Sequence, residues 1–400
     1  MNLRNKIFTL LLGISIFIGN NTLLAEDTKS SDIYKDKIET ISVFTNKIPN
    51  NIRFDEKYKG GHPDILDYVF VQTRVANVRE NPTTESNVIT KYGYGQKLRV
   101  LEKVKYKGNI WYKILLNNGS TGYISSNVVQ KRVFRFQLAL EKIKELEEFI
   151  EDAVANGEEL YSTSTYVPNP NNENLQQDVD KYGTTADQNL KTASIATGEK
   201  IYVPDRSVLK VLSKGATTSR VKVLSIPDEV MVPNNKLTKI PSITPDFKKV
   251  VAIDTTNQNV MIFEKQNDGV WALISYVYSK TGITSALGFE TPKGFFTAAF
   301  GRFVMQYNDE NGQKQGTARY AIRFCGGGYI HGTPMNLQEE VNREFYMKHK
   351  EASLGTFSGT RKCIRTTEPH ARFLFDWIIK NQNKNSNTQK IDEGVYFISF

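Results

Sequence analysis

The chain has 400 residues, more than one hydrophobic core usually organises, so two or three domains are expected. Hydrophobic residues make up 39% and charged residues 24%, a balance that excludes an intrinsically disordered chain and a chain built mainly of membrane spans. The formal net charge of +9 is modest, and no basic run is interleaved with stacking aromatic residues, so no nucleic-acid partner is expected.

The first 25 residues have the pattern of a secretory signal peptide. Arg4 and Lys6 precede an apolar run from Ile7 to Ile18, which is too short to span a bilayer comfortably. The small residue Ala25, followed by two acidic residues, offers a cleavage site. We therefore expect an exported protein of the periplasm or cell wall, with no stable membrane insertion after signal cleavage. An uncleaved anchor is the alternative.

Residues 26–67 are polar and irregular and are expected to form an N-terminal extension. Residues 68–131 contain short alternating apolar runs separated by turn residues, a pattern typical of a small all-β barrel. The string A-N-V-R-E-N-P from Ala76, then W-Y-K-I from Trp111, then G-S-T-G-Y-I from Gly119 resemble bacterial SH3-like domains. The resemblance implies a domain that binds cell-wall peptide, and a structural spacer is the alternative.

Residues 133–157 predict a connecting helix, because apolar residues recur at three- or four-residue steps and Gly157 follows them. Residues 158–247 predict either a linker or a small β domain of unknown role. The stretch from about Tyr166 to Lys200 is rich in Asn, Gln, Thr and Ser, so we expect an exposed connection with weak local structure there.

Residues 248–400 are again rich in strand-like runs, interrupted by two predicted helices near 337–350 and 369–381. Thr367 is a plausible N-cap of the second helix. The sequence therefore predicts a mainly β fold class, in which an SH3-like barrel is joined to a β-rich domain with peripheral helices.

Four strings in this last domain resemble the catalytic domain of the L,D-transpeptidases of YkuD type, and they occur in the family's order. The strings are Ser279-Lys280-Thr281-Gly282, Thr291-Pro292-Lys293-Gly294-Phe295-Phe296-Thr297, Tyr329-Ile330-His331-Gly332-Thr333 and Thr360-Arg361-Lys362-Cys363-Ile364-Arg365. The family's last motif has His and Gly where Arg361 and Lys362 stand here. The resemblance implies a peptidoglycan L,D-transpeptidase over 248–400 that forms cross-links through a cysteine thioester.

Cys363 is the expected nucleophile, because its polar, glycine- and cation-rich segment does not favour burial as an inert thiol. His331 is the expected base, because the other three histidines lack a matching motif and a thiol nucleophile needs a base within reach. Gly332 is also expected at the substrate. Its carbonyl or a neighbouring one would orient the imidazole, as the resemblance also implies.

The resemblance also implies an oxyanion hole made of the backbone N–H groups of Arg361, Lys362 and Cys363. Backbone donors survive side-chain replacement, but a lysine resists any position that needs a positive φ. The two cations would favour the thiolate if their charges lie near the sulfur. Arg365, together with Thr360, is expected to bind substrate, because a guanidinium matches the carboxylates of peptidoglycan stem peptides.

Cys325 is expected to be a buried small hydrophobe, and a disulfide with Cys363 is left open. No His, Cys or carboxylate cluster has metal-ligand spacing, so neither a metal nor an organic cofactor is expected. The expected partners are peptidoglycan stem peptides. Other functions that stay open are an L,D-carboxypeptidase, a papain-like cell-wall endopeptidase, in which the cysteine would precede the histidine, and a catalytically silent wall-binding scaffold.

Overall fold

The computed structural model describes residues 37–164, 178–239, 243–285, 288–308 and 312–400. The predicted signal peptide lies outside these residues, as does the start of the N-terminal extension. Strands predominate over helices in the described parts, which confirms the mainly β fold class. None of the helices described there has the length and apolar character needed to cross a membrane.

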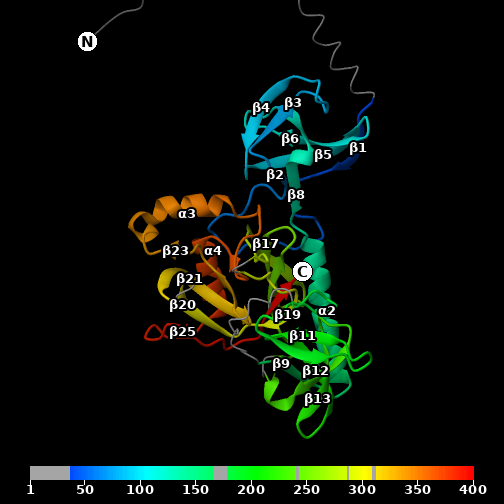
Figure 1. The fold of residues 1–400 in the computed structure, drawn as a ribbon, viewed down its shortest axis with the longest axis vertical. Helices are drawn as coiled ribbons and strands as arrows, with labels where there is room; N and C mark the ends of the chain where they lie inside the picture. The colour runs from blue at the N-terminus through cyan, green and yellow to red at the C-terminus, as the bar shows by residue number, and fades with distance from the viewer. Residues whose placement is uncertain (1–36, 165–177, 240–242, 286–287, 309–311) are drawn as a thin grey trace, which may run out of the picture.

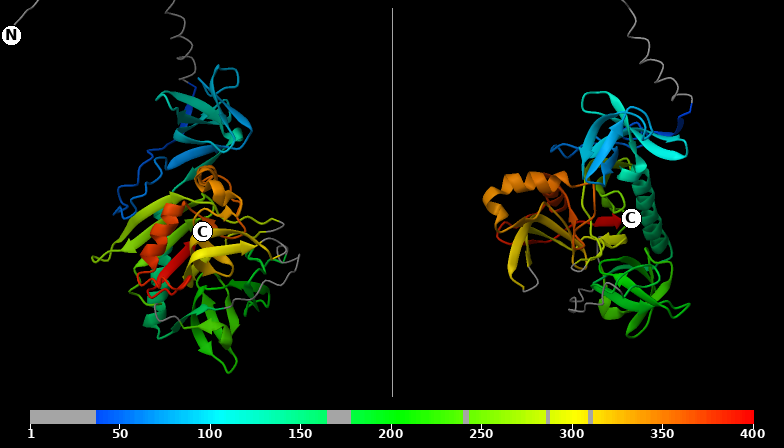
Figure 2. Two further views of the ribbon diagram at one scale, coloured as in Figure 1. Left: turned by 90° about the vertical axis from the view of Figure 1, so that its left-hand side faces the viewer. Right: turned by 45° about the horizontal axis from the view of Figure 1, so that its top comes forward.

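Three bodies follow one another along the long axis of the molecule (Figure 1). The N-terminal body (residues 37–133) lies at one end, the middle body (residues 158–239) at the other, and the C-terminal body (residues 243–400) between them. Helix α2, Phe136–Ala155, runs along one side of the C-terminal body and joins the two ends, as both views in Figure 2 show.

The N-terminal body is an antiparallel sheet of order β4-β3-β7-β6-β5-β2-β8, with β1 paired to β5. The strands are β1 Glu39–Val43, β2 Asp67–Val71, β3 Val75–Arg79, β4 Val88–Gly93, β5 Lys97–Tyr106, β6 Asn109–Leu115, β7 Thr121–Ser125 and β8 Val129–Val133, with the short helix η1 Ser126–Val128 before β8. Alternate side chains, such as Ala76 and Val78 of β3, point into one apolar core. The described part of the extension adds a contact to the C-terminal body, since the Leu273 N–H donates to the Arg53 carbonyl at 2.9 Å.

The apolar periodicity predicted for the connecting helix is confirmed by the side chains that α2 buries. The buried residues are Phe136, Ala139, Ile143, Leu146, Ile150 and Ala153, at three- or four-residue steps. All of these except Ala153 pack into one core cluster with β-strand residues of the C-terminal body such as Val250 and Phe263. The helix ends where predicted: Gly157 has φ 68, and the Glu158 N–H donates to the Ala153 carbonyl at 2.8 Å.

The middle body has a sheet of order β14-β13-β12-β9-β15 and a separate hairpin of β10 and β11, around an apolar core of its own. The elements are β9 Glu159–Thr163, β10 Asn189–Ala193, β11 Lys200–Pro204, β12 Val208–Lys214, β13 Thr218–Val223, β14 Glu229–Pro233, the short helix η2 Asn234–Lys236 and β15 Leu237–Thr238.

The weak local structure predicted from Tyr166 to Lys200 is wrong for the part that is described, residues 178–200, although many side chains of this part are exposed as predicted. Strand β10 lies there, and the carboxylates of Asp180 and Asp187 are buried. The polar composition was misleading because some of these polar side chains accept hydrogen bonds from backbone N–H groups. The Asp180 carboxylate, for example, accepts the N–H groups of Tyr182, Thr184 and Tyr202.

The C-terminal body contains a sheet of order β18-β17-β16-β26-β19 and a second of order β24-β22-β21-β20-β25, with β23 paired to β21. The strands of the first are β16 Lys249–Asp254, β17 Asn259–Lys265, β18 Trp271–Tyr278, β19 Gly294–Thr297 and β26 Val395–Ser399. Those of the second are β20 Phe300–Asn308, β21 Lys314–Cys325, β22 Gly328–His331, β23 Met335–Asn336, β24 Ile364–Arg365 and β25 Thr388–Gln389. One buried cluster joins the two sheets, with Ile262 and Phe397 from the first and Ile330 and Ile364 from the second.

Both predicted helices of this body are present. The first is a short helix η3, Glu339–Asn342, that continues into α3, Arg343–Ala352. The second is α4, Glu368–Ile378, whose N-cap Thr367 accepts the His370 N–H as predicted. Helix α4 contributes Leu374 and Phe375 to the core that joins the sheets.

Buried His370 makes the stability of this body depend on pH. Its Nε2 lies 3.0 Å from Ser275 Oγ, and burial lowers the pKa of the imidazole to about 3. Below about pH 6.5 the unfolded chain therefore binds a proton that the fold excludes, so stability present at neutral pH is lost on acidification.

We expect His370→Gln to weaken this dependence. The wild-type protein should lose about 1.4 kcal/mol per pH unit below about pH 6.5 through this histidine alone. The difference between the thermal midpoints at about pH 7 and about pH 5 should become smaller in His370→Gln. It should stay as in the wild type in His349→Gln, whose imidazole is exposed. Equal pH dependence in the wild type and in His370→Gln would contradict the assignment.

Candidate active site

Two short strands bring the predicted nucleophile and base together. β24 runs parallel to β22, with Ile364 opposite Ile330 and Arg365 opposite His331. Cys363 comes directly before β24, so the pairing places it beside the strand that ends in His331. The Cys363 sulfur lies 3.9 Å from the Gly327 carbonyl oxygen, in the turn that precedes β22.

The imidazole of His331 is oriented by its own chain neighbour. Its Nδ1 lies 2.7 Å from the Gly332 carbonyl oxygen, which can only accept, so Nδ1 carries the proton and Nε2 keeps its lone pair. Gly332 itself packs against the first turn of α4, where an added Cβ would lie 3.1 Å from the Glu368 Cα. The carbonyl that the sequence predicted as the orienting group is therefore held by close packing.

Burial sets the charge of this imidazole. His331 is 3% exposed, and burial lowers its pKa to about 4, aided by the positive charge of Arg365 and opposed by the Gly332 hydrogen bond. At neutral pH His331 is neutral, which is the state that a general base requires.

Cys363 is half-buried, and both Cys325 and Cys363 are free thiols. Burial raises the pKa of the Cys363 thiol, whereas a backbone hydrogen bond from Tyr329 and the charges of Arg365 and Lys362 lower it. The charge of Lys362 acts in the direction expected of a cation near the sulfur, but burial outweighs the cations, so the pKa of the thiol stays above its ordinary value. Cys325 is 1% exposed, as predicted for a small hydrophobe.

The loop before Cys363 has a conformation that lysine rarely adopts. Lys362 has φ 120, in the region that favours glycine. The other strings of the resemblance hold this loop: Thr291 Oγ1 donates to the Lys362 carbonyl at 2.7 Å and accepts the Gly282 N–H at 2.8 Å. A Cβ at Gly282 would lie 2.7 Å from the Lys362 Cα, so a glycine is required there.

The loop leaves three backbone donors unused. Across the described residues, the N–H groups of Arg361, Lys362 and Cys363 have no hydrogen-bond acceptor. Thr360 Oγ1 donates to the Cys363 carbonyl, which closes the loop on itself. Unpaired N–H groups beside a thiol are the arrangement that an oxyanion hole requires.

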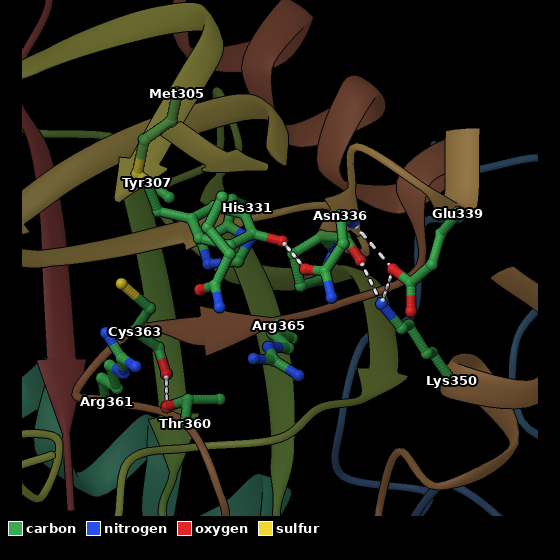
Figure 3. Close-up of a pocket in the computed structure, with 12 residues that line it drawn as sticks. Met305, Tyr307, His331, Asn336, Glu339, Lys350, Thr360, Arg361, Cys363 and Arg365 are labelled. Carbon is green, nitrogen blue, oxygen red and sulfur yellow. Dashed lines mark hydrogen bonds and ion pairs between the residues drawn. The ribbon is translucent and has the colours of Figure 1, made fainter. Parts of the chain in front are cut away.

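A cavity of about 420 Å³ opens over these residues (Figure 3). In this view Cys363 and Arg361 lie at one end, the Glu339–Lys350 ion pair lies at the other, and His331 and Arg365 lie between them. Three of the charged side chains are cations and one is an anion. Arg365 Nε has no partner within the described part of the chain, so the cavity has unused donor capacity for an anionic ligand.

The structure brings five of the predicted site residues to one cavity and places two others behind it. Cys363, His331, Thr360, Arg361 and Arg365 line the cavity. Gly332 holds the imidazole from behind, and the side chain of Lys362 points away into the middle body.

Sequence reasoning missed the far wall of the cavity. That wall is formed by Tyr307 of β20, Asn336 of β23, Glu339 of η3 and Lys350 of α3. The available signal was the long segment between His331 and Cys363, since an insertion between two site residues has to lie close to the site. Among the described residues, no group of three His, Cys, Asp or Glu side chains is placed to hold a metal.

Comparison with known proteins adds the following. Residues 74–130 match the family model of the bacterial SH3 domain, which confirms the predicted SH3-like domain. Two solved structures from Mycobacterium tuberculosis are similar to the chain, each with a TM-score of 0.25. L,D-transpeptidase 3 is 15% identical to this chain, and the match covers 53% of this chain and 78% of the transpeptidase chain. L,D-transpeptidase 1 is 13% identical to this chain, and the match covers 56% of this chain and 88% of the transpeptidase chain. No curated protein matches the sequence.

The neutral state of the Cys363 thiol and the His331 imidazole predicts how the reactivity of Cys363 varies with pH. Because burial raises the pKa of the thiol and lowers that of His331, the fraction of thiolate is small at neutral pH. We expect the rate of Cys363 alkylation by iodoacetamide to rise steadily from about pH 6 to beyond about pH 9. A plateau reached near pH 6, as for a stable thiolate–imidazolium pair, would contradict this prediction. Mass spectrometry separates the reaction from that of buried Cys325.

Proposed function

We propose that this chain is an exported peptidoglycan L,D-transpeptidase that works through a cysteine thioester. The observation that carries the proposal is the cavity lined by Cys363, His331 and Arg361, next to a loop, 361–363, whose N–H groups have no acceptor among the described residues. The four strings of the resemblance meet at this loop, since Gly282 and Thr291 hold its backbone.

In the proposed reaction, Cys363 Sγ attacks the carbonyl between the L-configured centre of a diamino acid and the terminal D-amino acid of a tetrapeptide stem. His331 Nε2 takes the thiol proton and passes it to the leaving amine, so the D-amino acid departs and a thioester remains. The N–H groups of the 361–363 loop stabilise the oxyanion in each step. The amino group of a second stem then attacks the thioester, gives its proton to His331, and forms the cross-link as the thiol is released.

The cavity's charge matches this substrate. Stem peptides carry several carboxylates, and Arg365 offers a planar fork whose Nε is unused within the described residues. Arg361 adds a second cation next to the nucleophile. The Glu339–Lys350 pair at the far wall offers both signs of charge, which suits a zwitterionic diamino acid.

The rival functions are less consistent with these observations. A papain-like endopeptidase would have its cysteine before its histidine, whereas His331 precedes Cys363. A silent scaffold was suggested by Arg361 and Lys362 in the last motif, but the loop keeps a positive φ and free N–H groups despite both replacements. An L,D-carboxypeptidase uses the same thioester with water as acceptor. The SH3-like domain would hold the enzyme on the wall.

Acylation by a carbapenem tests the nucleophile. This β-lactam class presents a strained amide that the family's cysteine is expected to open, so the intact mass of purified protein should increase by one carbapenem. Cys325→Ala should keep the adduct, because that thiol is 1% exposed. An adduct that persists in Cys363→Ala, or none in the wild type, would disprove the thioester mechanism.

Removal of the imidazole tests the base. With no group to move the proton, His331→Ala should lose on the order of 10²-fold or more in cross-linking of purified muropeptides. Binding to peptidoglycan sacculi should be unchanged, since it is assigned to the SH3-like domain. The matched control is His349→Ala, an exposed histidine of α3. Wild-type cross-linking in His331→Ala would remove His331 from the mechanism.

A further inference from the structure

The side chain of Lys362 is the feature of the site that the proposed reaction does not use. The residue has φ 120, where side chains are unfavourable, yet it stands directly before Cys363 in the loop assigned to the oxyanion. Such a conformation persists only when surrounding contacts hold it. The contacts of the Lys362 side chain therefore bear on the geometry of the site.

The ammonium of Lys362 is anchored in the middle body. Its Nζ lies 2.6 Å from Asp187 Oδ2, 3.3 Å from the Asp187 carbonyl oxygen and 2.8 Å from the Gly326 carbonyl oxygen. Three acceptors match the three donors of an ammonium group. The side chains of the pair are only 4% and 3% exposed, so each charge depends on the other for its stabilisation.

The same segment of the middle body supports the other side of the nucleophile. Gln188, next to Asp187, packs against the turn before β22: a Cβ at Gly326 would lie 2.8 Å from the Gln188 carbonyl oxygen. This turn carries the Gly327 carbonyl, 3.9 Å from the Cys363 sulfur. Residues 187–188 thus contact both chain segments that flank the thiol.

We propose that Asp187 is a positioning residue for the oxyanion loop, so that the middle body holds the site in its reactive conformation. Lys362 replaces the glycine that the backbone favours, and its ion pair with Asp187 holds the strained φ that a glycine would adopt unaided. The inference rests on the proposed function, because it assigns the loop its role in acylation. It gives residues 158–239 a part in the chemistry, although neither member of the pair lines the substrate cavity.

Two double variants separate positioning from ordinary docking of the bodies. Asp187→Asn/Lys362→Gly and Asp187→Asn/Lys362→Ala both lack the ion pair and the buried charge. They differ only in that glycine accepts φ 120 and alanine does not. The second-order rate of carbapenem acylation should be within about threefold of wild type for the glycine variant and on the order of 10²-fold lower for the alanine variant. Equal rates for the two would show that acylation does not depend on this φ.

Single variants and an independent readout complete the test. Asp187→Asn alone should acylate on the order of 10²-fold more slowly. The control is Asp205→Asn, which removes the partner of Arg323, a 2.5 Å ion pair across the same interface that does not touch Lys362, and should react at the wild-type rate. Thermal midpoints show which variants are folded. Equal rates for the two double variants, or a wild-type rate in folded Asp187→Asn, would overturn the proposal.

Failure of the proposed function is distinguishable from failure of this inference. If the wild-type protein forms no carbapenem adduct, the transpeptidase assignment fails. The rate of Cys363 alkylation by iodoacetamide then compares the same variants without cell-wall chemistry. Faster alkylation in the glycine double variant than in the alanine one would support positioning of the loop by Asp187, and equal alkylation would contradict it.

Discussion

The candidate site depends on the parallel pairing of β22 and β24, two strands that are too short to be stable without support. Ile330 and Ile364 pair across them and are fully buried in the core that joins the sheets of the C-terminal body. This register sets His331 beside Arg365 and starts β24 directly after Cys363. A slip of one residue would turn these side chains to the opposite face, so the apolar pair fixes the geometry of the polar site.

Burial of the two side chains then sets the charge states of His331 and Cys363. Desolvation lowers the pKa of His331 and raises that of Cys363, so both groups are neutral at neutral pH, and the nearby cations do not reverse this. A neutral pair requires proton transfer during attack, which gives the imidazole a defined task. The cations Arg361 and Arg365 line the cavity, where they would be available to the carboxylates of the proposed substrate.

The three bodies contribute differently to this site. Helix α2 packs its apolar face on the C-terminal body and joins the other two bodies on either end, so their placement does not rely on a loose linker. The N-terminal body touches the C-terminal body through the extension near Arg53. The middle body reaches the nucleophile loop through Asp187, a contact between residues 175 positions apart in the chain. Within the described part of the middle body, Asp187 and its neighbour Gln188 contact the two chain segments that flank the thiol.

The sequence by itself determined the elements whose burial repeats along the chain: α2 with its end at Gly157, α4 with Thr367 as its cap, and the alternating strands. It also singled out Cys363, His331 and Arg365 through strings with a recognisable order. Tertiary structure alone decided the far wall formed by Tyr307 and Lys350, the direction of the Lys362 side chain, and the burial of the Asp180 and Asp187 carboxylates. The physical reason is that periodicity reports which face of one element is buried, whereas pKa values, ion-pair partners and cavities depend on groups that distant segments bring together.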